Sequence, residues 1–213
     1  MFTIITAAAH TEMTLLEVVK SELEITGSSN DGMLTEYIQQ ASDYIRTYTG
    51  RYFAKETVEE TFQSRGGRKL MVSRYPLVSI SFIEFSGTSV GATTYEIDNS
   101  TAGIIWREAG FTHTILSDEF ITLQPTKDGR RDWKVRYVAG YNMPGTTGVD
   151  RDFPYDLERA CVDLVKNWFL TKTADPMIQR QQTGDASETR FATSRGVPPG
   201  VLNTLNNWRK LDL

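Results

Sequence analysis

Few side chains in this chain of 213 residues are suited to covalent chemistry or metal binding. His10 and His113 are its only histidines, and neither belongs to a metal-ligand spacing such as His-x-x-x-His. Cys161 is its only cysteine, so an intrachain disulfide and a thiolate metal cluster are both excluded. Because Cys161 falls on the apolar face of a predicted helix, we expect it to act as a small buried hydrophobe and not as a nucleophile.

Carboxylates are more plentiful, and two neighbouring pairs, Glu59-Glu60 and Asp118-Glu119, could supply an acid and a base to a glycosidase. If Glu59 and Glu60 lie on one strand, however, their side chains point to opposite faces of the sheet. The sequence contains no Gly-x-Ser-x-Gly elbow, no P-loop and no Gly-x-Gly-x-x-Gly fingerprint. We therefore predict no catalytic residue, no metal site and no cofactor, and keep a carbohydrate-binding or carbohydrate-processing β module as a less favoured alternative.

The composition and net charge of the chain limit the kinds of partner that we expect, nucleic acid and membrane in particular. Hydrophobic residues make up 39% and charged residues 23% of the chain, which is typical of a globular protein. The formal charge of -4 argues against a dedicated nucleic-acid clamp but allows DNA to pass nearby without specific binding. The start of the chain lacks the basic region of a signal peptide, and no apolar run approaches the roughly 20 residues of a membrane span. We expect no membrane partner and a reducing cytoplasm.

Apolar residues at three-four spacing predict two helices near the start of the chain. Thr14-Leu-Leu-Glu17 has the form of a capping box, with Met13 and Val18 placed to form a hydrophobic staple. The second helix, over 33–48, shows the clearest helical period. Gly50 then supplies a left-handed stop. Two more helices are predicted after Pro154 and after Pro198-Pro199.

Between the two helical pairs, the hydrophobic period changes to two, and short Gly, Ser, Asn and Asp clusters separate the segments. This pattern predicts an antiparallel sheet or small sandwich. The predicted strands are 57–62, 70–72, 77–85, 94–97, 103–106, 119–123 and 133–138. The fold class is therefore α+β: a bundle of about four helices, from 1–52 and 150–213, interrupted by an antiparallel β insertion over 53–149.

The segment Thr173–Gly196 is long, polar and nearly free of periodicity. Such connections are usually mobile loops or functional segments. The first alternative here is a flexible surface loop, and the second is a segment that becomes ordered only against a partner. Under the second alternative, the candidate partner-binding residues lie in this segment and in the last helix. They are Gln179, Arg180, Phe191, Arg195, Val201, Leu202, Leu205 and Trp208.

Aromatic residues follow the helices at core spacing. Tyr37, Tyr44 and Tyr48 lie along the second helix, and Trp168 with Phe169 ends the third. The favoured interpretation is that these side chains fill a small helical core. The alternative is a protein-binding surface, where Tyr and Trp are over-represented.

Six segments, taken in order, give the chain a resemblance to a known family. They are Thr14–Leu23, Leu34–Arg51, Arg74–Ile80, Val135–Tyr141, Phe153–Ala160 and Val197–Leu202, the last followed by Trp208-Arg209. Each is mostly helix caps and core spacing, but their joint order resembles the head–tail connector proteins of tailed bacteriophages, also called adaptor or head-completion proteins.

The resemblance implies a helical bundle with a β insertion and a structural role without enzymatic activity. It implies a homo-oligomeric ring of about a dozen copies in the phage neck, assembled in the host cytoplasm. The implied partners are the portal protein above, a stopper or tail-completion protein below, and DNA that passes through the channel. A stopper or tail-completion protein of similar build is the alternative for this chain itself.

Overall fold

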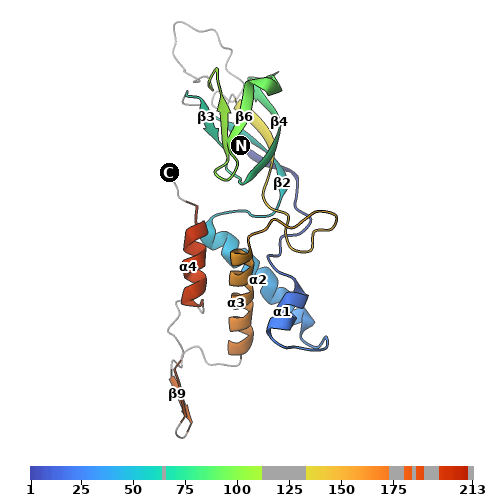
Figure 1. Cartoon of the computed structure of the whole chain (residues 1–213), viewed down its shortest axis with the longest axis vertical. Helices are drawn as coiled ribbons and strands as arrows, with labels where there is room; N and C mark the ends of the chain where they lie inside the picture. Colours follow the sequence, from blue (N-terminus) through green and yellow to red (C-terminus); the bar gives the residue numbers. More distant parts are fainter. Residues whose placement is uncertain (64–65, 112–132, 173–179, 184–185, 190–196, 211–213) are drawn as a thin grey trace. The chain divides into compact units, whose positions relative to one another are not determined.

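The computed structural model describes residues 1–63, 66–111, 133–172, 180–183, 186–189 and 197–210 (Figure 1). Helices and antiparallel strands are both present, which confirms the predicted α+β class. In chain order, the elements are β1 (Phe2–Thr6), α1 (Leu16–Glu22), α2 (Asp31–Thr49), β2 (Glu56–Phe62), β3 (Lys69–Met71), β4 (Leu77–Phe85), β5 (Thr88–Ser89), η1 (Ala92–Thr94), β6 (Tyr95–Asn99), β7 (Ile104–Arg107), β8 (Trp133–Ala139), α3 (Tyr155–Thr171), β9 (Arg180–Thr183), β10 (Ala186–Thr189) and α4 (Pro199–Trp208).

The chain forms two compact units. The β unit comprises Met1–Ala9 and Tyr52–Asn142, and the helical unit comprises His10–Arg51 and Met143–Leu213. The sequence had assigned the first nine residues to the helices, and this assignment is wrong. Phe2–Thr6 form β1 and pair with β2, because a run of Ile and Thr favours extended backbone.

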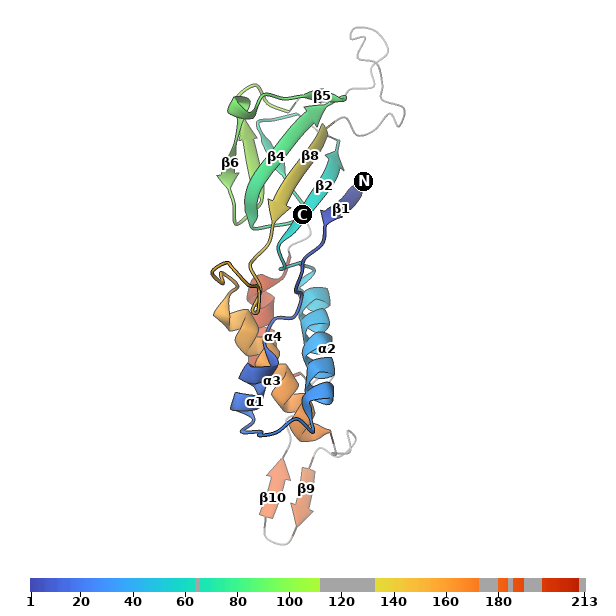
Figure 2. The ribbon, with the colours of Figure 1, turned by 90° about the vertical axis from the view of Figure 1, so that its right-hand side faces the viewer.

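The β unit contains a five-stranded and a three-stranded antiparallel sheet. The larger sheet has the strand order β1-β2-β8-β4-β5, and the smaller has the order β3-β7-β6 (Figure 2). β8 lies at the centre of the larger sheet and pairs along its whole length with β2. The strand predicted at 119–123 lies outside the described residues.

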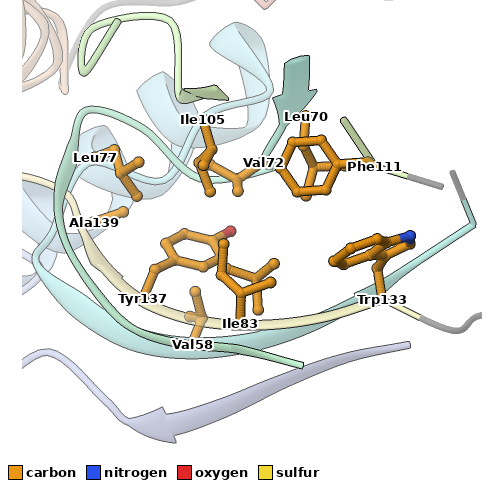
Figure 3. Packing of buried hydrophobic residues seen from close by; sticks show 11 residues of the cluster. Val58, Leu70, Val72, Leu77, Ile83, Ile105, Phe111, Trp133, Tyr137 and Ala139 are labelled. Carbon is orange, nitrogen blue, oxygen red and sulfur yellow. The ribbon is translucent and has the colours of Figure 1, made fainter. Parts of the chain in front are cut away.

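The two sheets enclose one hydrophobic core (Figure 3). Val58 and Ile83 of the larger sheet lie across from Leu70 and Ile105 of the smaller one. The burial pattern of β8 alternates strictly, with every second side chain buried, as expected for a strand whose one face packs on a core. Trp133 closes one end of this core, with its ring centre 5.0 Å from that of Phe111.

The helical unit packs α1, α2 and α4 against α3. Its buried side chains follow the predicted three-four spacing on α2 and α3. They include Leu34, Ile38, Ala41 and Ile45 on α2, and Leu157, Ala160, Cys161, Leu164 and Val165 on α3. Gly50 ends α2 with φ +65°, which confirms the predicted left-handed stop.

The start of α1 differs from the prediction. Thr14 does not cap the helix: it is buried, and its hydroxyl donates to Glu158 Oε1 of α3 at 3.3 Å. The N-cap position belongs to Leu15, which carries no side-chain cap. Val18 is exposed, so it does not form a staple with the buried Met13. The Thr14 hydroxyl therefore bonds to Glu158 and not to the backbone at the start of α1. The helix loses a side-chain cap, and the buried Glu158 carboxylate gains a hydrogen bond.

Within Thr173–Gly196, the described residues form a hairpin in which β9 and β10 pair in an antiparallel ladder. Among the described residues, no helix is both long and apolar enough to cross a bilayer.

Candidate interaction surfaces

A buried carboxylate organises the inner face of the β unit. Glu60 of β2 is only 8% exposed, and its oxygens accept hydrogen bonds from the backbone N–H and the hydroxyl of Ser73. Tyr137 of β8, fully buried, donates its phenol to Glu60 Oε2 at 2.9 Å and accepts from the Arg74 N–H at 3.3 Å. Burial, and the negative charge of Glu60, raise the pKa of Tyr137. This network joins strands that are far apart in sequence.

The neighbouring carboxylate, Glu59, lies on the opposite face of the sheet. Its Oε2 accepts from Arg136 Nη2 at 2.7 Å, across the β2–β8 pair. This confirms that Glu59 and Glu60 point to opposite faces, so the pair does not form the convergent carboxylates of a glycosidase. Asp118-Glu119, the other candidate pair, lies outside the described residues.

Arg74 is held between aromatic rings beside the buried network. Its guanidinium carbon lies 3.3 Å from the ring centre of Tyr52 and 4.8 Å from that of Phe2. Its Nη1 pairs with Glu56 Oε2 at 3.1 Å, with both side chains largely buried. Burial lowers the pKa of Arg74, and the charge of Glu56 opposes this shift. An ion pair stacked in this way fixes the turn before β4.

The last helix is fixed to the helical unit along its length. Val201 and Leu205, predicted as partner-binding residues, are buried in the core, so their side chains are not available to another chain. Trp208 is half-buried and donates from Nε1 to Asp156 Oδ2 of α3 at 2.7 Å. Leu202 is also half-buried.

The other predicted partner-binding residues lie in Thr173–Gly196. Gln179, Phe191 and Arg195 lie outside the described residues. Arg180 is the first residue of β9, of which only the backbone is described. The prediction that these residues bind a partner stays a prediction.

The aromatic side chains predicted for the helical core, along α2 and near the end of α3, are half-buried. They are thus neither fully inside a helical core nor fully exposed as a protein-binding surface. Tyr37 meets Trp168 edge to face, with ring centres 6.3 Å apart. Tyr48 stacks on Tyr44 and donates to Asn206 Oδ1 of α4 at 2.8 Å. These rings therefore join helices to one another and still present one edge to the surface.

Charged side chains join α1 to α3 on the surface of the helical unit. Glu22 accepts from Arg159 at 3.0 Å and from Lys166 at 2.9 Å. The hydrogen bond from Arg159, and then that from Lys166, lower the pKa of Glu22 to about 2. Asp163 pairs with Arg159 from the next turn of α3. The acidic side chain is therefore neutralised within the unit.

Cys161 is buried, as predicted. Burial raises the pKa of its thiol to about 12, which keeps it protonated at neutral pH. Within the described ranges, no group of three or more His, Cys, Asp or Glu side chains is placed to hold a metal ion.

One exposed surface has no counterpart in the sequence-based predictions. All five residues of β1 are exposed, and Phe2, Ile4 and Ile5 present large apolar side chains at the edge of the larger sheet. The sequence feature that could have indicated this exposed strand is the uncharged run Met1–Ala9. It had been weighed only as a targeting segment.

The described residues thus combine two compact units, ion pairs within each unit and an apolar strand at a sheet edge. A family model described as "Head completion protein" matches residues 12–211. The chain belongs to the head completion protein family. This confirms the resemblance drawn from the sequence, and with it the structural role at the junction of head and tail.

Solved structures with the same fold come from gene transfer agent (GTA) particles. The neck of an empty GTA particle computed with C6 symmetry contains a chain 16% identical to this one, with a TM-score of 0.59. The neck of a native GTA particle computed with C12 symmetry contains one 15% identical, with a TM-score of 0.56. Each match covers 100% of this chain and 97% of the other. Among curated proteins, none matches this chain by sequence.

Proposed function

We propose that this protein forms a ring in the neck of a tailed virus or virus-like particle, below the portal, without enzymatic activity. The observation that carries the proposal is the match over the whole chain to proteins of particle necks, joined to membership of the head completion family. Those necks were computed with C6 and C12 symmetry. A cyclic assembly of about a dozen copies is the corresponding arrangement for this chain.

The charge of the chain suits a conduit. Its formal charge is -4, and nine of its described Lys and Arg side chains form ion pairs within the fold, among them Arg74, Arg136 and Arg159. Tight binding to phosphates requires clustered, available cations and releases counterions. A mildly acidic ring therefore lets DNA pass during packaging and ejection without holding it.

The portal is the proposed partner on the head side, and the segment Thr173–Gly196 with the exposed part of α4 is the proposed contact. Leu202 and Trp208, both half-buried, remain the proposed contact residues on α4, together with Gln179, Arg180, Phe191 and Arg195 before it. Deleting Gln179–Ser194 is expected to abolish binding to the portal while the circular dichroism spectrum and melting behaviour are kept. Portal binding by the deletion variant, at the wild-type level, would show that the contact lies elsewhere.

The proposed function is tested by removing the protein from particle assembly. Particles made without it are expected to contain heads with a portal, separate tails and no joined particles, and the purified protein is expected to restore joining when added to the heads. Restoration only after prior mixing with tails would indicate a stopper or tail-completion role instead. Normal joined particles in its absence would refute a role in the neck.

A further inference from the structure

The edge strand β1 carries a continuation of the hydrophobic core that its own unit covers only in part, through Arg74 against the Phe2 ring. Phe2 pairs with Glu60 and Ile4 with Val58, so these side chains share the inner face of the larger sheet. Glu60 and Val58 are 8% and 0% exposed, but Phe2 and Ile4 are 39% and 46% exposed. On β1, therefore, the core face of the larger sheet is much less covered than on β2.

Protein edges of this kind are usually protected. A strand at the end of a sheet presents unpaired N–H and C=O groups, and charged residues, prolines or covering loops normally prevent another chain from pairing with it. Met1–Ala9 contains no charged residue and no proline. An unprotected apolar edge indicates a strand meant to be covered in the assembled state.

The other end of the same sheet is similarly free of charge. β5 pairs with Glu84 and Phe85 of β4 and is the last strand in the order β1-β2-β8-β4-β5. The segment Ser86–Tyr95 around it has no charged side chain, although 23% of the whole chain is charged. Thr88 and Ser89 are exposed, and the following Val90 packs against the core of the unit.

A closed ring needs two different, complementary surfaces on every copy, because its contacts run head to tail. The two ends of one open sheet meet this requirement: they differ in sequence, and at about 4.8 Å per strand they lie roughly 19 Å apart across the sheet. We propose that β1 of one copy adds to the β5 end of the larger sheet in the next copy, so that sheets join edge to edge around the ring.

Strand addition of this kind supplies main-chain hydrogen bonds and buries the apolar side chains at the junction. Phe2 and Ile4 would extend the inner face toward Val90 of the neighbouring copy. Neither edge brings a charged side chain that must be desolvated, and the Met1 ammonium donates to Thr61 Oγ1 of its own unit. The inference rests on the proposed ring and adds its subunit contact.

Cross-linking tests the contact in the assembled protein. Ile4→Cys combined with Thr88→Cys, which pairs with Phe85 and so lies on the same inner face as Ile4, is treated with a short bismaleimide after assembly on the portal. The native Cys161 is buried and reacts slowly, so the background is low. We expect a ladder of covalent oligomers that rises to the full ring. The matched control replaces Ile4→Cys by Met71→Cys, on β3 of the smaller sheet and 52% exposed, and is expected to give no ladder.

The outcomes separate this contact from the ring itself. If the wild-type protein forms no ring under electron microscopy, the proposed function fails and the contact fails with it. If rings form but the double variant gives no ladder, only the contact is overturned. Cross-linked dimers from Ile4→Cys alone would indicate two-fold pairing of β1 with β1, and a ladder from the control pair would indicate non-specific reaction. Each of these also overturns the proposal.

A charge at the edge gives a second, independent measurement. Ile4→Lys is expected to leave the monomer folded and to reduce the fraction of protein in rings at least tenfold, because the lysine would be desolvated at the junction. Met71→Lys, with a similar exposed fraction, is the control and is expected to form rings as the wild type does. Equal ring formation by both variants would contradict the contact.

Discussion

The buried phenol of Tyr137 is expected to be a principal stabilising group of the β unit, and Tyr137→Phe tests this with a single atom removed. The hydroxyl donates to the Glu60 carboxylate at 2.9 Å and accepts from the Arg74 N–H at 3.3 Å. The substitution keeps the ring that packs beside Ile83 in the core (Figure 3). It therefore isolates the polar contribution.

The magnitude follows from the two lost contacts. A hydrogen bond to a charged group contributes about 1.5–3 kcal/mol, and a buried donor left without a partner costs about 1–3 kcal/mol. Glu60 keeps both donors of Ser73, and the Arg74 contact is long, so the lower ends of both ranges apply. We expect a loss of about 2.5 kcal/mol, which in a unit of this size lowers Tm by at least about 10 °C.

Urea unfolding followed by tryptophan fluorescence measures this loss, since Trp133 lies in the same core. Tyr95→Phe is the matched control: Tyr95 packs against that core, and its hydroxyl has no hydrogen bond among the described residues. We expect this control to stay within about 0.5 kcal/mol of the wild type. If Tyr137→Phe were equally neutral, the network around Glu60 would not contribute to stability as derived from the structure.

Three further expectations concern other parts of the chain. Gly140→Ala should destabilise the β unit by more than about 2 kcal/mol in urea unfolding, because φ is +108° and the new Cβ would lie 2.8 Å from the Phe53 carbonyl oxygen. Glu22→Gln should weaken the acid dependence of stability: the native pKa of about 2 lies below the ordinary 4.5, so the wild type loses this contribution as pH falls from about 4.5 toward 2. The pKa of Cys161 is raised from 9 to about 12, so stability should fall as pH rises between these values, and Ellman's reagent should react at pH 8 only after unfolding. Reaction of the folded protein at the rate of a free thiol would contradict its burial.

The sequence predicted the elements whose signal is local and periodic. The spacing of Leu34, Ile38, Ala41 and Ile45 specified the buried face of α2, because one helical face meets the core at that period. The end of α2 at Gly50 was equally predictable, because the left-handed backbone conformation that ends a helix favours glycine at that single position.

Features that depend on tertiary contacts were not predicted. Thr14 has the sequence context of a helix cap, yet its hydroxyl meets Glu158, which is distant in the chain. The spacing of Val201 and Leu205 predicts one apolar face of α4, but a sequence does not show whether such a face packs on the chain's own core or on a partner. In the structure both side chains are buried in the core. β1 was missed because five residues of Phe, Ile and Thr without alternation carry no period, and only pairing with β2 makes them a strand.

Ring formation and attachment to the portal are the two properties on which the proposed function depends. Electron microscopy of the purified protein, alone and mixed with the portal protein of the same particle, tests both most directly. We expect rings with a central hole, or a new layer of matching symmetry stacked on the portal. Monomers that leave the portal unchanged at concentrations well above those of assembly would contradict the proposed function.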